Sequence, residues 1–247
     1  MFSYYGGKSK IIKHYPSPKY SLIIEPFAGS ARYALLHGKG KLVWLNDKYD
    51  VVYEIWKYLK LTNKERINWL PAIKKGDDIR KLTNLTDAEK LLLGMSVSTG
   101  RAEPGYTVTS FGDKTSYPKE DPRWRPNSQW TLTKRRILQN LDLIIGWRLT
   151  NLDYREMDNV EATWYIDPPY QFGGDLYVEN KIDYKELADW CRSRKGQVIV
   201  CENSKADWLP FKPLVQLCGQ KHKTMEVIYE QDSTTVTPII HHALPTF

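Results

Sequence analysis

The sequence predicts an α/β fold built on a mainly parallel sheet. Three observations predict it: short apolar runs that end in polar residues, helical periodicity between those runs, and the return of this alternation late in the chain. Apolar runs of about four to eight residues bounded by turn signals are typical of buried strands, and strands that alternate with helices require crossover connections. The 247 residues are enough for one substantial core with a smaller lobe.

The first half of the pattern lies in residues 21–61. SLIIE predicts a strand that leads directly into the turn residues PFAGS, and ARYALLHGKG predicts a helix stopped by Gly38 and Gly40. KLVWLND predicts a second strand that ends at Asn46 and Asp47. The segment DVVYEIWKYLK follows as a helix, with one apolar face made of Val51, Val52, Ile55, Trp56 and Leu59.

Residues 59–149 have a different pattern and predict an inserted lobe that is mainly helical and rich in loops. KERINWLPAIKK, DAEKLLLGMSVS and TLTKRRILQNLDLI predict helices, whereas residues 99–129 are rich in Gly, Pro, Ser and Thr without apolar periodicity. A loop region of this length in a compact domain is usually functional or an insertion. The main domain is therefore expected to comprise residues 1–58 and 150–247.

Strands and helices alternate again in the last hundred residues. TWYID predicts a buried strand, DYKELADWCRSRKG a helix capped by Asp183 and ended by Gly196, and QVIVC another strand. The segments TMEVIYE and TVTPIIHH are close enough in the sequence to pair as a hairpin.

The charge of the chain favours a polyanionic partner. The formal net charge is +7 and the pI is about 9.1. From Lys119 to Arg148 there are seven basic and three acidic residues, and Trp124, Trp130 and Trp147 lie among them. Aromatic side chains between cations suit a surface that binds phosphates and stacks bases. The alternative is a solvated basic helix whose tryptophans face the core.

Several classes of protein are disfavoured by composition. No apolar run approaches the roughly 20 residues needed to span a bilayer, and the N-terminal MFSYYGGKSK lacks the pattern of a secretory signal, so we expect a cytoplasmic protein without a membrane partner. Cys191, Cys201 and Cys218 have neither CxxC spacing nor a nearby His cluster. We therefore expect neither a disulfide framework nor a metal site.

Two strand ends hold candidate functional residues. Asp47 lies 18 residues after Gly29, and an acid at about this distance from a glycine-containing first turn can bind ribose hydroxyls at the carboxyl edge of a sheet. This spacing indicates an adenosine-containing cofactor. The alternative for Asp47 is an N-cap of the helix that follows it.

The catalytic candidates are Asp167, Pro168, Pro169 and Tyr170. A carboxylate and a carbonyl can hold the hydrogens of an exocyclic amine, two prolines restrict the backbone and remove its donors, and a tyrosine ring can stack on a base. This set suits a planar amine substrate. The alternative is a strand-ending acid followed by a Pro–Pro turn.

YYGGK, EPFAGS, WLND and YIDPPY occur in this order over nearly the whole chain. Together they resemble the Dam-like class of N6-adenine DNA methyltransferases, in the arrangement called alpha. The resemblance implies a Rossmann-like, S-adenosylmethionine-dependent methyltransferase sheet with residues 59–149 as an inserted target-recognition lobe. It also implies double-stranded DNA as the partner and no metal.

The resemblance further implies the roles of individual residues. Asp167 and the Pro168 carbonyl would hold N6 of a flipped adenine, Tyr170 would stack on its ring, and the methyl group would pass directly from the sulfonium without a covalent enzyme intermediate. The residues implied to bind S-adenosylmethionine are Tyr4, Gly6, Gly7, Lys8, Glu25, Pro26, Phe27, Ala28, Gly29, Ser30, Asp47 and Asp167.

Three features depart from the family pattern. Ala31 stands where a further glycine is usual, Ser3 stands where relatives can place a basic side chain, and RAEPGYTVTSFG matches the family's recognition loop poorly. The target sequence therefore stays open. We expect DNA contacts from residues that are equally compatible with solvated side chains: Arg101, Tyr106, Arg123, Arg125, Lys134 and Arg135.

Other functions are compatible with the same residues. The acceptor geometry suits N4 of cytosine as well as N6 of adenine, RNA could replace DNA, and the chain could be a non-catalytic nucleic-acid-binding protein on a methyltransferase scaffold. Cytosine C5 methylation is disfavoured because it needs a thiolate nucleophile, and none of the cysteines lies in a Pro-Cys pair. We expect Cys201, within VIVCEN, to be a buried strand residue.

Overall fold

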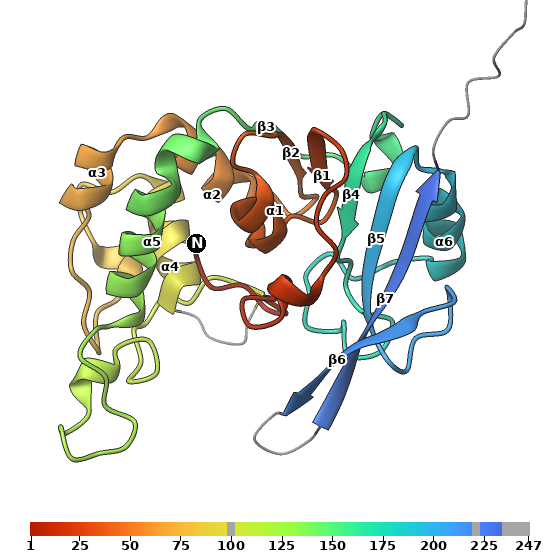
Figure 1. Cartoon of the computed structure of the whole chain (residues 1–247). Helices are drawn as coiled ribbons and strands as arrows, with labels where there is room; N and C mark the ends of the chain where they lie inside the picture. Colours follow the sequence, from red (N-terminus) through yellow and green to blue (C-terminus); the bar gives the residue numbers. More distant parts are fainter. Residues whose placement is uncertain (98–101, 219–222, 234–247) are drawn as a thin grey trace, which may run out of the picture.

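A computed structural model describes residues 1–97, 102–218 and 223–233, and it confirms the predicted α/β class. The described strands form one seven-stranded sheet in the order β3-β2-β1-β4-β5-β7-β6 (Figure 1). Five neighbouring strands run parallel: β3 (Arg148–Thr150), β2 (Leu42–Asn46), β1 (Leu22–Glu25), β4 (Ala162–Ile166) and β5 (Gly196–Asn203). The last two are antiparallel to their neighbours: β7 (Lys223–Ser233) and β6 (Lys212–Cys218).

Helices cover both faces of the sheet: α1 (Arg32–His37), α2 (Asp50–Leu61) and α6 (Tyr184–Ser193). Side chains alternate between the faces, so Ile23 and Val43 pack with α1 and α2, while their neighbours Ile24 and Trp44 pack with α6. The strands β1, β2, β4 and β5 are therefore buried on both sides, which explains their apolar sequences, whereas the edge strand β3 is exposed or half-buried.

Three further helices lie beside α2: α3 (Lys64–Trp69), α4 (Asp87–Val97) and α5 (Gln129–Ile144). Figure 1 shows them together at one side of the sheet. Their buried residues Ile67, Leu92 and Ile137 belong to the same apolar cluster as Ile55 of α2. The core is thus continuous from the sheet into these helices, and the division of the chain at residues 59 and 149 stays a prediction. Short 3-10 turns complete the described elements: η1 (Ile12–His14), η2 (Ile79–Lys81), η3 (Lys114–Ser116) and η4 (Tyr154–Glu156).

Two predicted helices end earlier than expected. α3 stops at Trp69 because Leu70 precedes Pro71 and is extended, with ψ of 135°. The helix capped by Asp183 ends at Ser193 rather than at Gly196, which is instead the first residue of β5, with φ of +94°.

The first strand of the predicted C-terminal hairpin pairs with other strands than the one predicted. TMEVIYE lies in β7, but its partners are β5 and β6, and TVTPIIHH lies outside the described residues. The strand β6 was not predicted because it contains Pro213. A proline without an N–H is tolerated there because β6 forms the edge of the described sheet.

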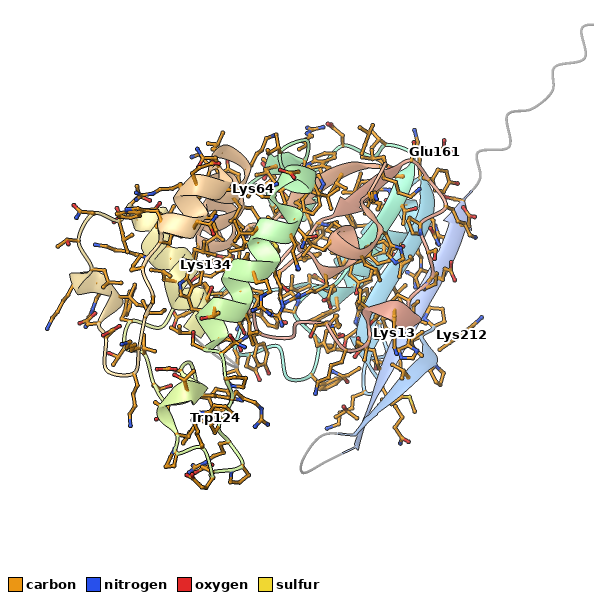
Figure 2. The ribbon with its side chains drawn as sticks, turned by 60° about the vertical axis from the view of Figure 1, so that its left-hand side comes forward. Lys13, Lys64, Trp124, Lys134, Glu161 and Lys212 are labelled. Atoms are coloured by element: carbon orange, nitrogen blue, oxygen red, sulfur yellow. The ribbon has the colours of Figure 1, made fainter. Side chains whose placement is uncertain are left out.

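Two of the three tryptophans of the basic region face the core and are not part of an exposed base-stacking surface. Trp130 and Trp147 are each only 2% exposed and belong to the main apolar cluster, as the core-facing interpretation predicted. Trp124 is half-buried on the loop region between α4 and α5 (Figure 2).

Cys191 and Cys201 are free thiols, and Cys201 is fully buried in β5 as expected. No helix within the described ranges is both long and apolar enough to cross a membrane.

Candidate active site

A pocket lies where the parallel strands β1 and β4 end side by side. The strand order reverses between β1 and β4, and open α/β sheets bind ligands at the carboxyl edge of such a switch point. Together with space that opens on solvent, the pocket encloses about 880 Å³. Its lining includes the segments 4–8 and 25–31 together with Asp47, Asp167 and Pro169. All twelve residues that the resemblance implies for the cofactor therefore meet in one place, whereas Pro168 and Tyr170 lie just outside the lining.

Asp47 connects the glycine turn to the start of α2. Its Oδ2 accepts a hydrogen bond from the Gly29 N–H at 2.8 Å, and its Oδ1 accepts one from the Tyr49 N–H at 3.0 Å. Tyr49, not Asp47, occupies the N-cap of α2. Burial raises the pKa of Asp47 to about 6, against the effect of these two backbone donors. Asp47 therefore organises the turn while it also lines the pocket.

The glycine turn has a left-handed backbone at two positions. Gly29 has φ of +46°, and Ala31, where the family usually has glycine, has φ of +45°. The departure at Ala31 thus keeps the backbone conformation that glycine favours. Gly29 is also packed closely, because a Cβ there would lie 2.9 Å from Cδ1 of Tyr4. Glu25, at the end of β1, is buried and accepts a hydrogen bond from the Ala34 N–H in the first turn of α1.

Lys8 and Asp167 form an ion pair at the inner end of the pocket. Lys8 is 7% exposed, and its Nζ lies 2.9 Å from Oδ1 of Asp167 and 4.5 Å from the centroid of the Tyr170 ring. Burial alone would lower the pKa of Lys8, but the charges of Asp167 and Glu226 raise it above its ordinary value. Burial raises the pKa of Asp167, and Lys8 opposes that shift. The pair is therefore held charged mainly by its own attraction.

The DPPY segment presents some acceptors to the pocket and uses others internally. The Pro169 carbonyl accepts a hydrogen bond from the Tyr184 hydroxyl at 2.8 Å. In the described part of the chain, no hydrogen bond reaches Oδ2 of Asp167 or the Pro168 carbonyl. The hydroxyl of Tyr170 donates to Oε1 of Glu226. Of these groups Asp167 lines the pocket, and the Pro169 carbonyl and the Tyr170 hydroxyl are held by hydrogen bonds to Tyr184 and Glu226.

Sequence reasoning missed three acidic or aromatic side chains around the pocket. Tyr177 donates to the Tyr5 carbonyl at 3.1 Å and packs against Tyr4 and Tyr5, so the loop after DPPY covers the N-terminal motif. Glu202 is fully buried and accepts a hydrogen bond from the Gln171 N–H. Glu226 lies on β7 in phase with the buried Ile228, and a carboxylate on an apolar strand face was the signal for it.

The predicted DNA contacts lie in different environments. Lys134 donates to the Asn68 and Leu70 carbonyls at the end of α3 (Figure 2). Arg123 forms a double hydrogen bond with Asp121. Arg125 donates to backbone carbonyls nearby. The guanidinium of Arg80 lies over the ring of Tyr106. Arg135 is exposed. Arg101 lies outside the described residues.

Among the residues that the structure places, no group of three or more His, Cys, Asp or Glu side chains could hold a metal ion. Burial raises the pKa of the Cys191 and Cys201 thiols, which disfavours a thiolate nucleophile.

Comparison with known proteins bears on the identity of the chain. The comparison with curated proteins found no match. A solved structure described as a conserved hypothetical protein of Streptococcus pyogenes is 9% identical, with 87% of each chain covered and a TM-score of 0.33. Residues 4–90, which contain YYGGK, EPFAGS and WLND and end before YIDPPY, match the model of the D12 class N6 adenine-specific DNA methyltransferases. The match covers less than half of the chain, and it shows that residues 4–90 are similar to this class, in line with the resemblance of the ordered motifs.

Proposed function

We propose that this protein is an adenine-specific DNA methyltransferase, that it uses S-adenosylmethionine, and that it acts on an adenine rotated out of the DNA duplex. The observation that supports the proposal best is that Asp167, the acid of the DPPY motif, lines the same pocket as all the other residues implied to bind the cofactor, and that no described hydrogen bond occupies its Oδ2 or the Pro168 carbonyl. An adenine inside a duplex stack cannot reach such a recessed site, so the base has to leave the helix.

Charged residues of both signs line the pocket. Five are acidic (Glu25, Asp47, Asp153, Asp167 and Glu179) and five are basic (Lys8, Arg32, Lys48, Arg155 and Lys181). Asp47 and Asp167, which follow β2 and β4, supply the negative charge that a cationic ligand would face. S-adenosylmethionine supplies a methyl group on a positively charged sulfonium. Asp47 would accept from the ribose hydroxyls, and the turn of residues 25–31 would line the methionine end.

The protein's part in the reaction is to position the amine. Asp167 and the Pro168 carbonyl accept its two hydrogens, which leaves the nitrogen lone pair directed into the pocket. The ammonium of Lys8 favours the ionised form of Asp167, which is an acceptor, and so opposes the effect of burial on the pKa of this carboxyl. The two prolines hold both acceptors in place because their φ angles are restricted. Tyr170 provides an aromatic face for the base.

A direct test is transfer of labelled methyl groups from S-adenosylmethionine to unmethylated DNA of mixed sequence, followed by nucleoside analysis. The proposal predicts N6-methyladenine. Label in N4-methylcytosine would assign the site to cytosine, and transfer to RNA in preference to DNA would change the substrate class.

Cofactor affinity is expected to depend on pH through Asp47. Since the pKa of this carboxylate is about 6, it is ionised above pH 7 and becomes protonated as the pH falls. If the ionised form binds the ribose, Kd for S-adenosylhomocysteine is flat above pH 7 and rises by about tenfold per pH unit well below pH 6. Calorimetry from pH 5 to pH 8 measures this. Asp47→Asn provides the control: a profile as steep in this variant would assign the titration to another group.

Adjacent basic residues on α5 are expected to differ in role. Replacing Lys134 with methionine removes the hydrogen bonds to the end of α3 and is expected to lower the free energy of unfolding by about 1 to 2 kcal/mol. Replacing the exposed Arg135 with methionine should leave stability within about 0.5 kcal/mol and lower the salt slope of DNA binding by about one. Denaturant titration and DNA titration at several salt concentrations separate the two. An unchanged slope for Arg135→Met would move the DNA path away from this side of α5.

A further inference from the structure

Glu226 lies at the catalytic edge of the sheet although it comes from a distant part of the chain. β7 runs antiparallel to β5, so its N-terminal part reaches the edge at which the parallel strands end, and Glu226 pairs there with Asn203. The neighbouring strand β6 has a bulge between Pro213 and Val215, directly beside Glu226. Bulges of this kind locally redirect side chains and are frequent next to active sites.

The carboxylate of Glu226 is buried, and its Oε1 meets three polar neighbours. It is 5% exposed. Its Oε1 accepts hydrogen bonds from the hydroxyls of Tyr170 and Tyr15, and Lys8 Nζ lies 3.8 Å away. A buried carboxylate is costly unless charge and hydrogen bonds compensate it. An apolar strand face would be simpler for folding alone, so the position of this acid beside the catalytic motif suggests a functional reason.

We infer that Glu226 is a positioning residue that fixes the ring of Tyr170 for stacking on the target base. The inference rests on the proposed function, because it assumes that a base stacks on Tyr170. The ring is held at one end by the backbone after Pro168 and Pro169 and at the other end by the hydrogen bond to Glu226. With both ends held, the plane of the ring is defined before the base arrives.

The geometry of Lys8 supports this role. The ammonium of Lys8 lies over the Tyr170 ring and also contacts Asp167. One cationic group thus contacts both the ring and the carboxylate of the DPPY motif. Losing the hydroxyl anchor would let the ring tilt away from that common position. A tilted ring would still allow DNA to bind, because most of the affinity comes from phosphate contacts, but it would misplace the amine.

The inference is tested by a double-mutant cycle between Glu226→Ala and Tyr170→Phe, in which the second change removes only the hydroxyl. Each single variant is expected to lower kcat for methyl transfer by about tenfold, with KM for DNA within about threefold. Combined, they should lower kcat no further than either alone, because both remove one hydrogen bond. Glu226→Gln keeps an acceptor oxygen and should retain kcat within about threefold.

Controls separate positioning from folding and from the proposed function. Tyr15→Phe removes the other hydrogen bond to Glu226 and should leave kcat within about twofold. Calorimetry should give Glu226→Ala an unchanged Kd for S-adenosylhomocysteine, and thermal unfolding shows whether each variant is folded. The inference would be overturned if Glu226→Ala lowered kcat by a further tenfold in the Tyr170→Phe background. Loss of S-adenosylhomocysteine binding by Glu226→Ala would also overturn it. No transfer by the unaltered protein would instead refute the proposed function.

Discussion

Replacing Asp167 with alanine is expected to reduce methyl transfer by at least about 1000-fold, because the variant loses both the acceptor for the amine and the partner of Lys8. DNA affinity should change by less than about threefold, since phosphate contacts dominate it. Single-turnover rates with labelled S-adenosylmethionine and DNA titrations measure the two effects separately.

Asp167→Asn is the matched variant for this experiment. It keeps the size of the side chain and one acceptor oxygen, but it removes the negative charge opposite Lys8. Its rate should lie between those of the unaltered protein and Asp167→Ala. Near-normal turnover in Asp167→Ala would contradict the role of this carboxylate.

Replacing Gly29 with alanine is expected to weaken cofactor binding by at least about 100-fold. A side chain at φ of +46° is strained, and the added Cβ would lie 2.9 Å from the ring of Tyr4, which also lines the pocket. The Gly29 N–H is also held by Asp47, so the turn cannot move without losing that hydrogen bond. Calorimetry with S-adenosylhomocysteine measures the loss.

Gly40→Ala is the control for backbone strain. Gly40 has φ of +74°, but no atom lies within 4 Å of an added Cβ. This variant should lose about 1 kcal/mol of stability and bind the cofactor normally. Equal cofactor losses in both variants would show that general destabilisation, and not the contact with Tyr4, causes the effect.

Four of the five parallel strands could be predicted from the sequence because they are buried on both faces. Runs such as LIIE and LVWLN are mainly apolar, and the residues that follow them reach the same edge of the sheet by topology. The short edge strand β3 was not predicted because its sequence, RLT, has no apolar run. Glu25, Asp47 and Asp167 could be placed at this edge because each lies at or just after the end of a predicted strand, whereas the place of residues 4–8 was implied only by the resemblance.

Other features depend on contacts between distant parts of the chain. Glu226 is 56 residues from Tyr170, and only the pairing of β7 with β5 brings the two together. The ammonium of Lys134 donates to the carbonyl of Leu70, which lies 64 residues earlier where α3 ends. Local sequence patterns contain no record of such pairings, so neither contact could be predicted.

Methylation of adenine N6 in DNA is tested most directly by expressing the protein in a host that lacks adenine methylation and mapping modified bases across its genome. We expect N6-methyladenine within one short sequence motif, and none in a parallel strain that expresses Asp167→Ala at the same level. An unmodified genome in the presence of folded protein, or a genome modified at cytosine N4, would contradict it.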